Sequence, residues 1–378
     1  MKRIILLLSL VCIVSLTSNV KEVFCLPWPP EIDIIEISFN YDSGSTTYDA
    51  VTLKANASTY KPVPEWKAGV RNDKVAYIQN QTNRKIKTKF QLDRSGSYDM
   101  GVYAEEYQAS YGIGDVYESM VHFDDSDKST PKVMTCDGSV PSGVRKQDRF
   151  FYWKWYVTCI GEPPWEPEEF EEPLYIGYTG VHNYYTLLGA PQNPMSEPWT
   201  SVLDYACDWA DGKSDDNDVA QMVAECIYNE LGDKDGDIDY DGWSHYTSDY
   251  WNFELTSFLY DIENESSVEV NCSDVGNLFN IFSAALGLSS MSKVIEAVST
   301  FNTYDIDPIG SPGWTTIGWV YHQYGWFESK VDDACIRIDR WGTPRVPTNM
   351  SQGDYEDYLI DSGTIEFSAT DVTTIVEE

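Results

Sequence analysis

The pattern of hydrophobic and polar residues differs between the two halves of the chain. Between residues 32 and 160, short runs alternate hydrophobic and polar positions, as in residues 34–39 and 85–92, and Gly, Asn, Asp and Ser interrupt them. Alternation with a period of two and frequent turns is typical of antiparallel strands that each bury one face. The sequence therefore predicts an antiparallel β-sandwich over residues 28–162, with the aromatic run 150–157 as its last strand.

Helical spacing dominates the second half, residues 175–378. Hydrophobic residues at helical intervals predict helices over residues 198–210 and 218–231, and a third helix, which is expected to be fully buried, begins at Cys272. Residues 253–260 fit either a short helix or a strand. The last segments with strand character are residues 314–324, 327–338 and 363–367. Helices followed by strands favour an α+β domain.

A segment rich in proline and acidic residues lies between the two halves, from Gly161 to Pro173. Proline lacks the backbone N–H that a helix or a central strand needs, and such composition is common in linkers. We expect residues 163–174 to be a linker between two domains.

The first residues have the composition of a secretion signal. A basic start, residues 1–3, precedes a nearly unbroken apolar run, residues 4–16, and small residues follow. A bilayer-spanning helix needs about 20 apolar residues, so this run is too short, and no second run of that length follows. Residues 1–25 are therefore a predicted signal peptide, and the mature protein is expected to be secreted or extracytoplasmic, with no transmembrane segment.

Charge and cysteine content narrow the possible partners. A formal net charge of −35 repels phosphate groups and argues against a nucleic-acid partner. Export permits disulfides. Of the eight cysteines, Cys12 lies in the signal peptide, and the odd number that remains fits one free thiol. We expect Cys136–Cys159 and Cys207–Cys226 disulfides and a reduced Cys272; the sequence does not indicate an oligomeric state.

Cys272 is the candidate nucleophile. It opens the third helix, where free N–H groups and the helix dipole stabilise a thiolate. His322 follows fifty residues later and Asp333 eleven residues after that, which gives the roles of nucleophile, base and orienting carboxylate. A buried structural cysteine is the alternative, because free cysteine is among the most buried residue types. The ordered histidine and aspartate favour the nucleophile.

These motifs resemble the transglutaminase-like superfamily of papain-type folds over about residues 175–359. The shared features are Cys-Ser-Asp leading into a helix that ends in Ala-Leu-Gly-Leu, histidine on one strand, and Asp-Ala-Cys on the next. Asp333 fits this pattern better than Asp332 because it directly precedes Ala334-Cys335. The predicted architecture is an N-terminal immunoglobulin-like antiparallel β-sandwich followed by a transglutaminase-like, papain-type α+β domain (residues 175–378), whose nucleophile helix packs against an antiparallel sheet.

The resemblance implies acyl transfer through a Cys-His-Asp triad on peptide or protein amides. His322 would take the thiol proton, Cys272 would attack the carbonyl, and water or an amine would resolve the acyl-enzyme. Trp243 and Trp251 are candidates for the second oxyanion donor, and His245 for a substrate-side residue. We expect a protease or amidase; a protein-cross-linking transglutaminase and a catalytically inactive cell-surface binding or scaffold module are the alternatives.

One acidic segment suggests calcium. Asp237, Asp239 and Asp241 followed by Gly242 match the start of a calcium loop, D-x-D-x-D-G. The twelfth position is Ser248, so the bidentate glutamate of such a loop is missing, and a plain acidic turn is the alternative. We expect no required cofactor, with calcium as a possible ligand of these three aspartates.

Overall fold

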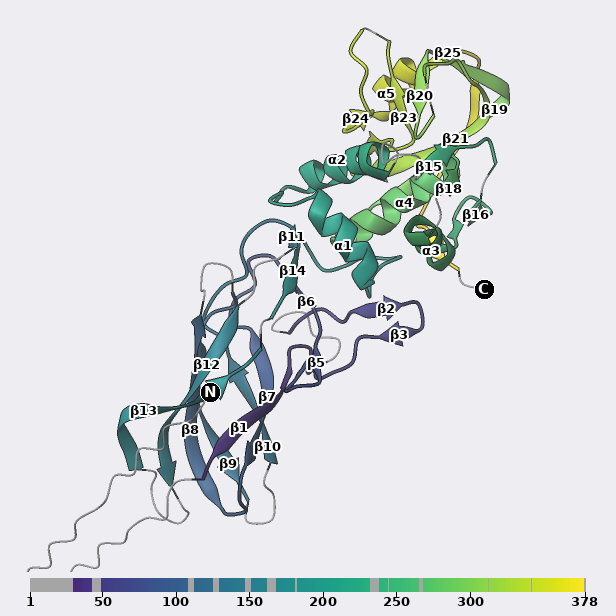
Figure 1. Cartoon of the computed structure of the whole chain (residues 1–378). Coiled ribbons are helices and arrows are strands. Elements are labelled where there is room, and N and C mark those ends of the chain that lie inside the picture. Colours follow the sequence, from purple (N-terminus) through teal and green to yellow (C-terminus); the bar gives the residue numbers. More distant parts are fainter. Residues whose placement is uncertain are drawn as a thin grey trace, which may run out of the picture.

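The computed structural model describes most of the chain after residue 29. The described ranges are residues 30–42, 49–107, 112–124, 129–146, 151–161, 168–180, 182–231, 238–243, 245–264, 268–311, 313–340 and 342–376. The predicted signal peptide lies outside them. No helix in these ranges is long and apolar enough to span a membrane. Strands outnumber helices, and the molecule is elongated (Figure 1).

Two antiparallel sheets form the N-terminal half. One has the order β10-β7-β1-β4-β5 and the other β13-β12-β8-β9. The strands of the first are β1 (Ile32–Ser38), β4 (Trp66–Lys67), β5 (Arg71–Asn72), β7 (Lys85–Leu92) and β10 (Ser129–Thr135). Those of the second are β8 (Tyr98–Tyr107), β9 (Val116–Phe123), β12 (Tyr152–Gly161) and β13 (Glu168–Tyr178). A hairpin of β2 (Lys54–Asn56) and β3 (Thr59–Tyr60) stands beside them.

The two sheets share one hydrophobic core. Along β12, buried and partly exposed residues alternate, and the buried positions include Trp153 and Trp155. Phe90 of β7 meets Trp155 edge-on, with ring centroids 5.8 Å apart. Large aromatic side chains bury much apolar area, so this contact joins the two layers. The two-layer antiparallel arrangement agrees with the prediction, and the immunoglobulin-like designation stays a prediction.

The predicted linker is in large part a strand. β13 covers residues 168–178 and pairs with β12 at the edge of the four-stranded sheet. The pairing register shifts twice, and Pro173 lies between the paired segments Glu168–Glu169 and Leu174–Tyr175. An edge strand tolerates proline because one row of its backbone groups needs no partner. The acidic, proline-rich composition therefore marks a sheet edge here, and the expectation of a linker over residues 163–174 is wrong for its described part.

A small three-stranded sheet joins the two halves. β14 (Tyr184–Leu187) pairs in parallel with β6 (Val75–Ile78) and antiparallel with β11 (Arg145–Lys146). The hydrophobic core of the C-terminal half extends into this sheet and includes Val51, Leu53 and Val144 from the N-terminal half. The first strand after the predicted domain boundary is thus held by strands from before it.

Helices and one six-stranded sheet make up the C-terminal half. The helices are α1 (Thr200–Trp209), α2 (Asp216–Cys226) continued by the π-helical turn η1 (Ile227–Leu231), α3 (Leu255–Asn264), α4 (Cys272–Ala285) and α5 (Gln352–Leu359). The sheet has the order β24-β22-β21-β19-β25, with β26 also on β19. Its strands are β19 (Met291–Thr303), β21 (Gly318–Phe327), β22 (Lys330–Asp332), β24 (Met350–Ser351), β25 (Ile360–Ser362) and β26 (Ile365–Asp371).

Short strand pairs complete this half. β15 (Ile238–Tyr240) pairs with β18 (Val268–Val270), and β20 (Ile306–Pro308) pairs with β23 (Ile336–Ile338). A three-stranded sheet has the order β16 (Thr247–Ser248), β17 (Asn252–Phe253), β27 (Thr374–Ile375).

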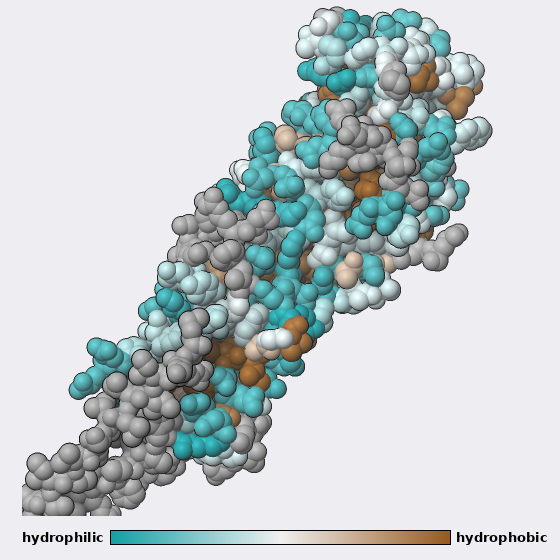
Figure 2. All heavy atoms as spheres, viewed as in Figure 1, coloured by the Kyte–Doolittle hydropathy of each residue, from teal (hydrophilic) through white to brown (hydrophobic). Residues whose placement is uncertain are grey.

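Helix α4 packs directly on strand β21. All fourteen residues of α4 are buried, as expected, including the polar side chains of Asp274, Asn277 and Asn280. Gly325 permits the close approach, because a Cβ at this position would overlap the Phe279 ring. The predicted helix against an antiparallel sheet is present, whereas the papain-type designation stays a prediction. Figure 2 shows hydrophilic residues over most of one molecular face, with hydrophobic residues in small separate patches.

The predicted disulfides are wrong: all six described cysteines are free. Cys136 is part of the sandwich core, whereas Cys159 lies outside that cluster, beside Gly101. Cys207 is fully buried in α1, and Cys226 interacts with Glu230 at the end of α2. Each thiol therefore lies in an environment of its own.

Candidate active site

A capping box fixes Cys272 at the first residue of α4. The Asn271 side chain accepts hydrogen bonds from the backbone N–H groups of Ser273 (2.8 Å) and Asp274 (3.1 Å). The Asp274 carboxylate in return accepts from the Asn271 N–H at 3.0 Å. These bonds occupy N–H groups that a helix start otherwise leaves unpaired. Cys272 is only 2% exposed.

His322 and Asp333 form a fully buried pair next to this helix. His322 lies on β21, and its Nε2 is 2.9 Å from Oδ2 of Asp333, which directly follows β22. The same Oδ2 accepts a hydrogen bond from the Tyr355 hydroxyl at 2.6 Å, and Oδ1 accepts one from the Cys335 N–H at 2.9 Å. Three donors therefore hold the Asp333 carboxylate in one orientation.

The pKa of His322 results from opposing influences. Burial of the imidazole lowers the pKa, but the negative charge of Asp333, the hydrogen bond to it and the neighbouring Cys272 thiol raise it. The resulting pKa is about 9 instead of the ordinary 6.5. The imidazole is thus protonated at neutral pH, and Nε2–H donates to Asp333.

The second ring nitrogen of His322 is left for the thiol. Nδ1 is buried and makes no well-aligned hydrogen bond among the described residues, although the thiol interacts with the ring strongly enough to raise its pKa. Both observations fit an approach of Cys272 to Nδ1 that is not yet well aligned, as is frequent in unliganded catalytic sites.

Asp332, the rejected alternative to Asp333, has a different environment. Its Oδ1 accepts a hydrogen bond from the Asn349 N–H at 3.0 Å. Burial raises the pKa of Asp332 to about 7, although that hydrogen bond lowers it. The contact with His322 is made by Asp333.

Neither Trp243 nor Trp251, the predicted oxyanion donors, makes a contact with Cys272 among the described residues. Trp243 is 76% exposed, and the Trp251 ring contacts Tyr250 with centroids 6.2 Å apart. Trp319 is instead the tryptophan of this site, with its ring centroid 4.3 Å from that of His322. Its Nε1 is buried without a hydrogen-bond partner in the described part of the chain.

Tyrosines surround the thiol. The Tyr321 hydroxyl accepts a hydrogen bond from Asn271 Nδ2 at 3.3 Å. Burial and the nearby Cys272 raise the pKa values of both Tyr321 and Tyr240. The sequence reasoning missed these tyrosines, and also Tyr355 and Trp319. The position of Trp319 three residues before His322 was visible, but no local pattern marks Tyr355.

The remaining predicted residues lie beside this site. The His245 backbone N–H donates to Asp274 at 3.2 Å, while its imidazole contacts Asp241. Of the three aspartates expected to bind calcium, Asp237 lies outside the described residues; Asp239 belongs to β15, and Asp241 directly follows it.

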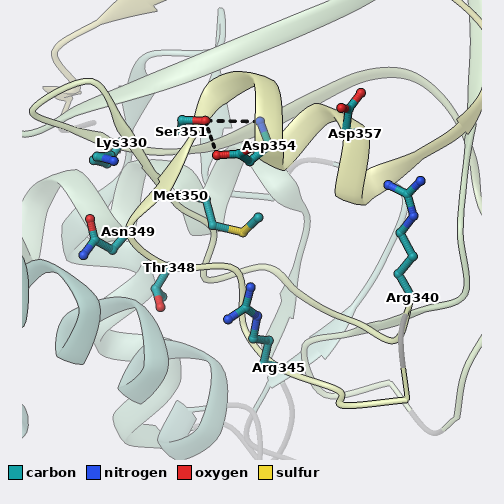
Figure 3. Close-up of a pocket in the computed structure, with 9 residues that line it drawn as sticks. All are labelled: Lys330, Arg340, Arg345, Thr348, Asn349, Met350, Ser351, Asp354 and Asp357. Atoms are coloured by element: carbon teal, nitrogen blue, oxygen red, sulfur yellow. Dashed lines mark hydrogen bonds between the residues drawn. The ribbon is translucent and has the colours of Figure 1, made fainter.

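A separate pocket of about 520 Å³ lies along α5 (Figure 3). The side chains that line it come from β22, β24, α5 and the loop before β24: Lys330, Arg340, Arg345, Thr348, Asn349, Met350, Ser351, Asp354 and Asp357. Three of them are basic, in a chain whose net charge is −35. The pocket shares α5 with the triad through Tyr355, but Cys272 does not line it.

The comparisons with known proteins found similarity among solved structures but not among family models or curated proteins. No protein-family model matches the chain, and no curated protein matches it. Among solved structures, it is similar to red sea bream transglutaminase, with a TM-score of 0.35 and 8% sequence identity, over 73% of this chain and 51% of that one. The chain thus spans about half the length of that transglutaminase.

Proposed function

We propose that this protein is a cysteine-dependent acyl-transfer enzyme that hydrolyses peptide or protein amides. Cys272 is the nucleophile, His322 the base and Asp333 the orienting carboxylate. The observation that carries the proposal is the buried His322 Nε2–Asp333 hydrogen bond of 2.9 Å, which leaves Nδ1 for a thiol at a helix N-terminus. The order of cysteine, histidine and aspartate in the sequence supports it.

The proposed reaction begins with an ion pair. A pKa of about 9 for His322 favours the imidazolium at neutral pH, with the thiol proton on Nδ1. The thiolate attacks the amide carbonyl carbon, and the Cys272 backbone N–H is one donor for the oxyanion. The imidazolium then protonates the leaving amine, and the C–N bond breaks. Water adds to the acyl-enzyme, His322 accepts its proton, and the acid and the thiol are released.

In this proposal Tyr355 and the Cys335 N–H are positioning groups. Both donate to Asp333, so the carboxylate does not rotate away from Nε2. Asp333 in turn fixes which nitrogen of His322 faces the thiol. We also propose that the protein acts outside the cytoplasm, because residues 1–25 have the composition of a signal peptide.

The low exposure of Cys272 favours a second candidate, the catalytically inactive binding or scaffold module. A thiol that is 2% exposed needs local opening before any substrate reaches it. Protein cross-linking remains the alternative outcome of the same chemistry, with an amine in place of water.

Thiol labelling separates enzyme from scaffold. Iodoacetamide is added to the full chain between pH 5 and 10, and the modified cysteines are located by mass spectrometry. Cys272 is expected to react at neutral pH, and His322→Ala to slow it roughly 100-fold or more. Cys335 is the internal control, because burial raises its pKa well above the ordinary value. Equal, slow labelling of both cysteines would contradict the proposal.

The reaction class is tested on glutamine-containing peptides and on folded protein substrates. New peptide termini indicate hydrolysis of peptide bonds, and ammonia release without added amine indicates hydrolysis of side-chain amides. Incorporation of an added primary amine indicates cross-linking chemistry. Cys272→Ala is the control for all three measurements and is expected to abolish each of them.

A further inference from the structure

Metal-ligating side chains gather on the exposed face of the β15–β18 pair, outside the triad. Asp241, His245 and Glu269 each offer one donor atom, and these atoms lie within 4.8 Å of one another. Asp239 is paired with Glu269 in the parallel register, and both are exposed. Three carboxylates and one imidazole thus share a small area of surface.

One imidazole nitrogen lies between two carboxylates, and its one hydrogen bond, to Asp241, is long. His245 Nε2 lies 3.3 Å from Asp241 Oδ2 and 3.5 Å from Glu269 Oε2. A ring nitrogen carries at most one proton, so it cannot donate fully to both carboxylates. Charge-assisted N–H···O bonds are also shorter, about 2.7–2.9 Å. Two ligand atoms about 2.1 Å from a tetrahedral metal ion are about 3.4 Å apart, which matches both observed distances.

Charge also favours a cation here. Among the described residues, the ion pairs of Asp241 and Glu269 are with His245 alone. The carboxylates of Asp241 and Glu269 converge on the same ring nitrogen and repel each other. A divalent ion offsets this repulsion.

We propose that Asp241, His245 and Glu269 bind a divalent transition-metal ion, with Zn²⁺ as the first choice. Imidazole with carboxylates suits Zn²⁺, whereas Ca²⁺ takes oxygen ligands. Asp241 belongs both to the expected calcium loop and to this site. The other ligands differ: they are His245 and Glu269 of the neighbouring strand β18, in place of Asp237 and Asp239. Water completes the coordination.

The site is mechanically connected to the nucleophile helix. The backbone N–H groups of His245 and Tyr246 donate to the Asp274 carboxylate at 3.2 and 3.1 Å, and Asp274 caps α4. A metal ion on His245 therefore fixes the segment that follows Asp241 against the N-terminus of α4. The binding itself does not depend on the proposed enzymatic function.

Calorimetry with the full mature chain tests the proposal. Zn²⁺ and Ca²⁺ are titrated separately into the Cys272→Ser protein, in which the nucleophile thiol does not compete for Zn²⁺. One Zn²⁺ per chain is expected. His245→Asn and Glu269→Gln should each weaken Zn²⁺ binding at least about tenfold, since loss of even an outer partner costs 10–100-fold. Glu263→Gln, an exposed glutamate of α3, is the matched control and should change nothing.

Several results would overturn the metal site. Absence of Zn²⁺ binding is one, and Zn²⁺ binding unaffected by both variants is another. Ca²⁺ binding that is tighter than Zn²⁺ binding and survives His245→Asn would instead favour the aspartate loop. Circular dichroism of each variant checks its fold, and Asp241→Asn replaces any variant that is unfolded. A rise in melting temperature with Zn²⁺, lost in His245→Asn, is the second readout.

Discussion

Two buried histidines, His182 against the aromatic core of the sandwich and His322 beside helix α4, have opposite protonation behaviour. His182 is surrounded by aromatic rings, with centroids of Phe39, Phe151 and Trp153 at 5.0, 5.3 and 5.4 Å, and its hydrogen-bond partner is the Thr179 hydroxyl at 3.2 Å. Burial lowers the pKa of His182 to about 3. His322 is equally buried, yet its pKa is about 9.

The difference comes mainly from the Asp333 carboxylate, to which the neighbouring Cys272 thiol adds. Burial disfavours the charged imidazole at both positions, and only an adjacent negative charge reverses its effect. A histidine packed among rings is a polar core residue that remains neutral. A histidine paired with Asp333 holds a proton at neutral pH, which is what a thiol site requires.

Breaking the His322–Asp333 pair should have the largest effect. In Asp333→Asn the pKa of His322 should fall well below 9, because the carboxylate charge no longer opposes the effect of burial. Labelling of Cys272 at pH 7 should slow by roughly 10²–10⁴-fold. The matched change at the other histidine, Thr179→Val, should leave labelling within twofold, and equal effects of the two variants would refute the comparison.

The two histidines should oppose each other in the pH dependence of stability. The raised pKa of His322 contributes stability below pH 6.5, and this contribution is lost as the pH rises through 9, roughly 3 kcal/mol in all. The lowered pKa of His182 makes the folded state resist protonation, so stability falls below pH 6.5, by roughly 3 kcal/mol at pH 4.5.

Denaturant unfolding of variants isolates these contributions. His322→Gln should lose the alkaline dependence between pH 6.5 and 9, and His182→Phe should lose the acid dependence. Each is compared with the unaltered protein at every pH, so that other titrating groups cancel. A His182→Phe variant with unchanged acid sensitivity would contradict the assignment.

Tyr355→Phe should sharpen the comparison, because Tyr355 holds the carboxylate that distinguishes His322 from His182. It removes a hydrogen bond to a buried carboxylate and should lower the free energy of unfolding by about 2 kcal/mol. Tyr358 on the same helix donates to the neutral carbonyl of Ile338 at 3.0 Å, so Tyr358→Phe should cost about 1 kcal/mol. A larger loss in Tyr358→Phe than in Tyr355→Phe would be inconsistent with a charged acceptor at Asp333.

The smallest expected difference concerns the two tryptophans beside the histidines. Trp153 Nε1 donates to the Gly114 carbonyl at 2.9 Å, whereas Trp319 Nε1 is unpartnered among the described residues. Trp153→Phe should therefore destabilise the protein by about 1 kcal/mol more than Trp319→Phe. Equal melting shifts in the two variants would mean that the Trp153 hydrogen bond contributes nothing net.

Local patterns in the sequence predicted the elements whose burial follows one period. Helices α1, α2 and α4 have hydrophobic residues at helical spacing, and the alternation of β7 and β12 is equally regular. The spacing of Cys272, His322 and Asp333 also indicated the side chains that the fold brings together.

Elements that depend on distant neighbours were not predictable in this way. Strand β19 lies between β21 and β26, and its burial follows no alternation because both faces and both edges are covered in part. Helix α5 is short and polar, and its buried Tyr355 and Tyr358 pack against partners far along the chain. β13 has the composition of a linker because only its pairing with β12 makes it a strand.

The sheet of β6, β11 and β14 joins the two halves, so they are expected to evolve as one unit. A fragment starting near residue 175 would leave β14 with neither neighbour and would open the core at Val51, Leu53 and Val144. The C-terminal half is therefore not expected to fold when it is expressed alone or fused to another protein. A substitution in the core shared by the two halves should be tolerated only when a second substitution on the other side restores the packing.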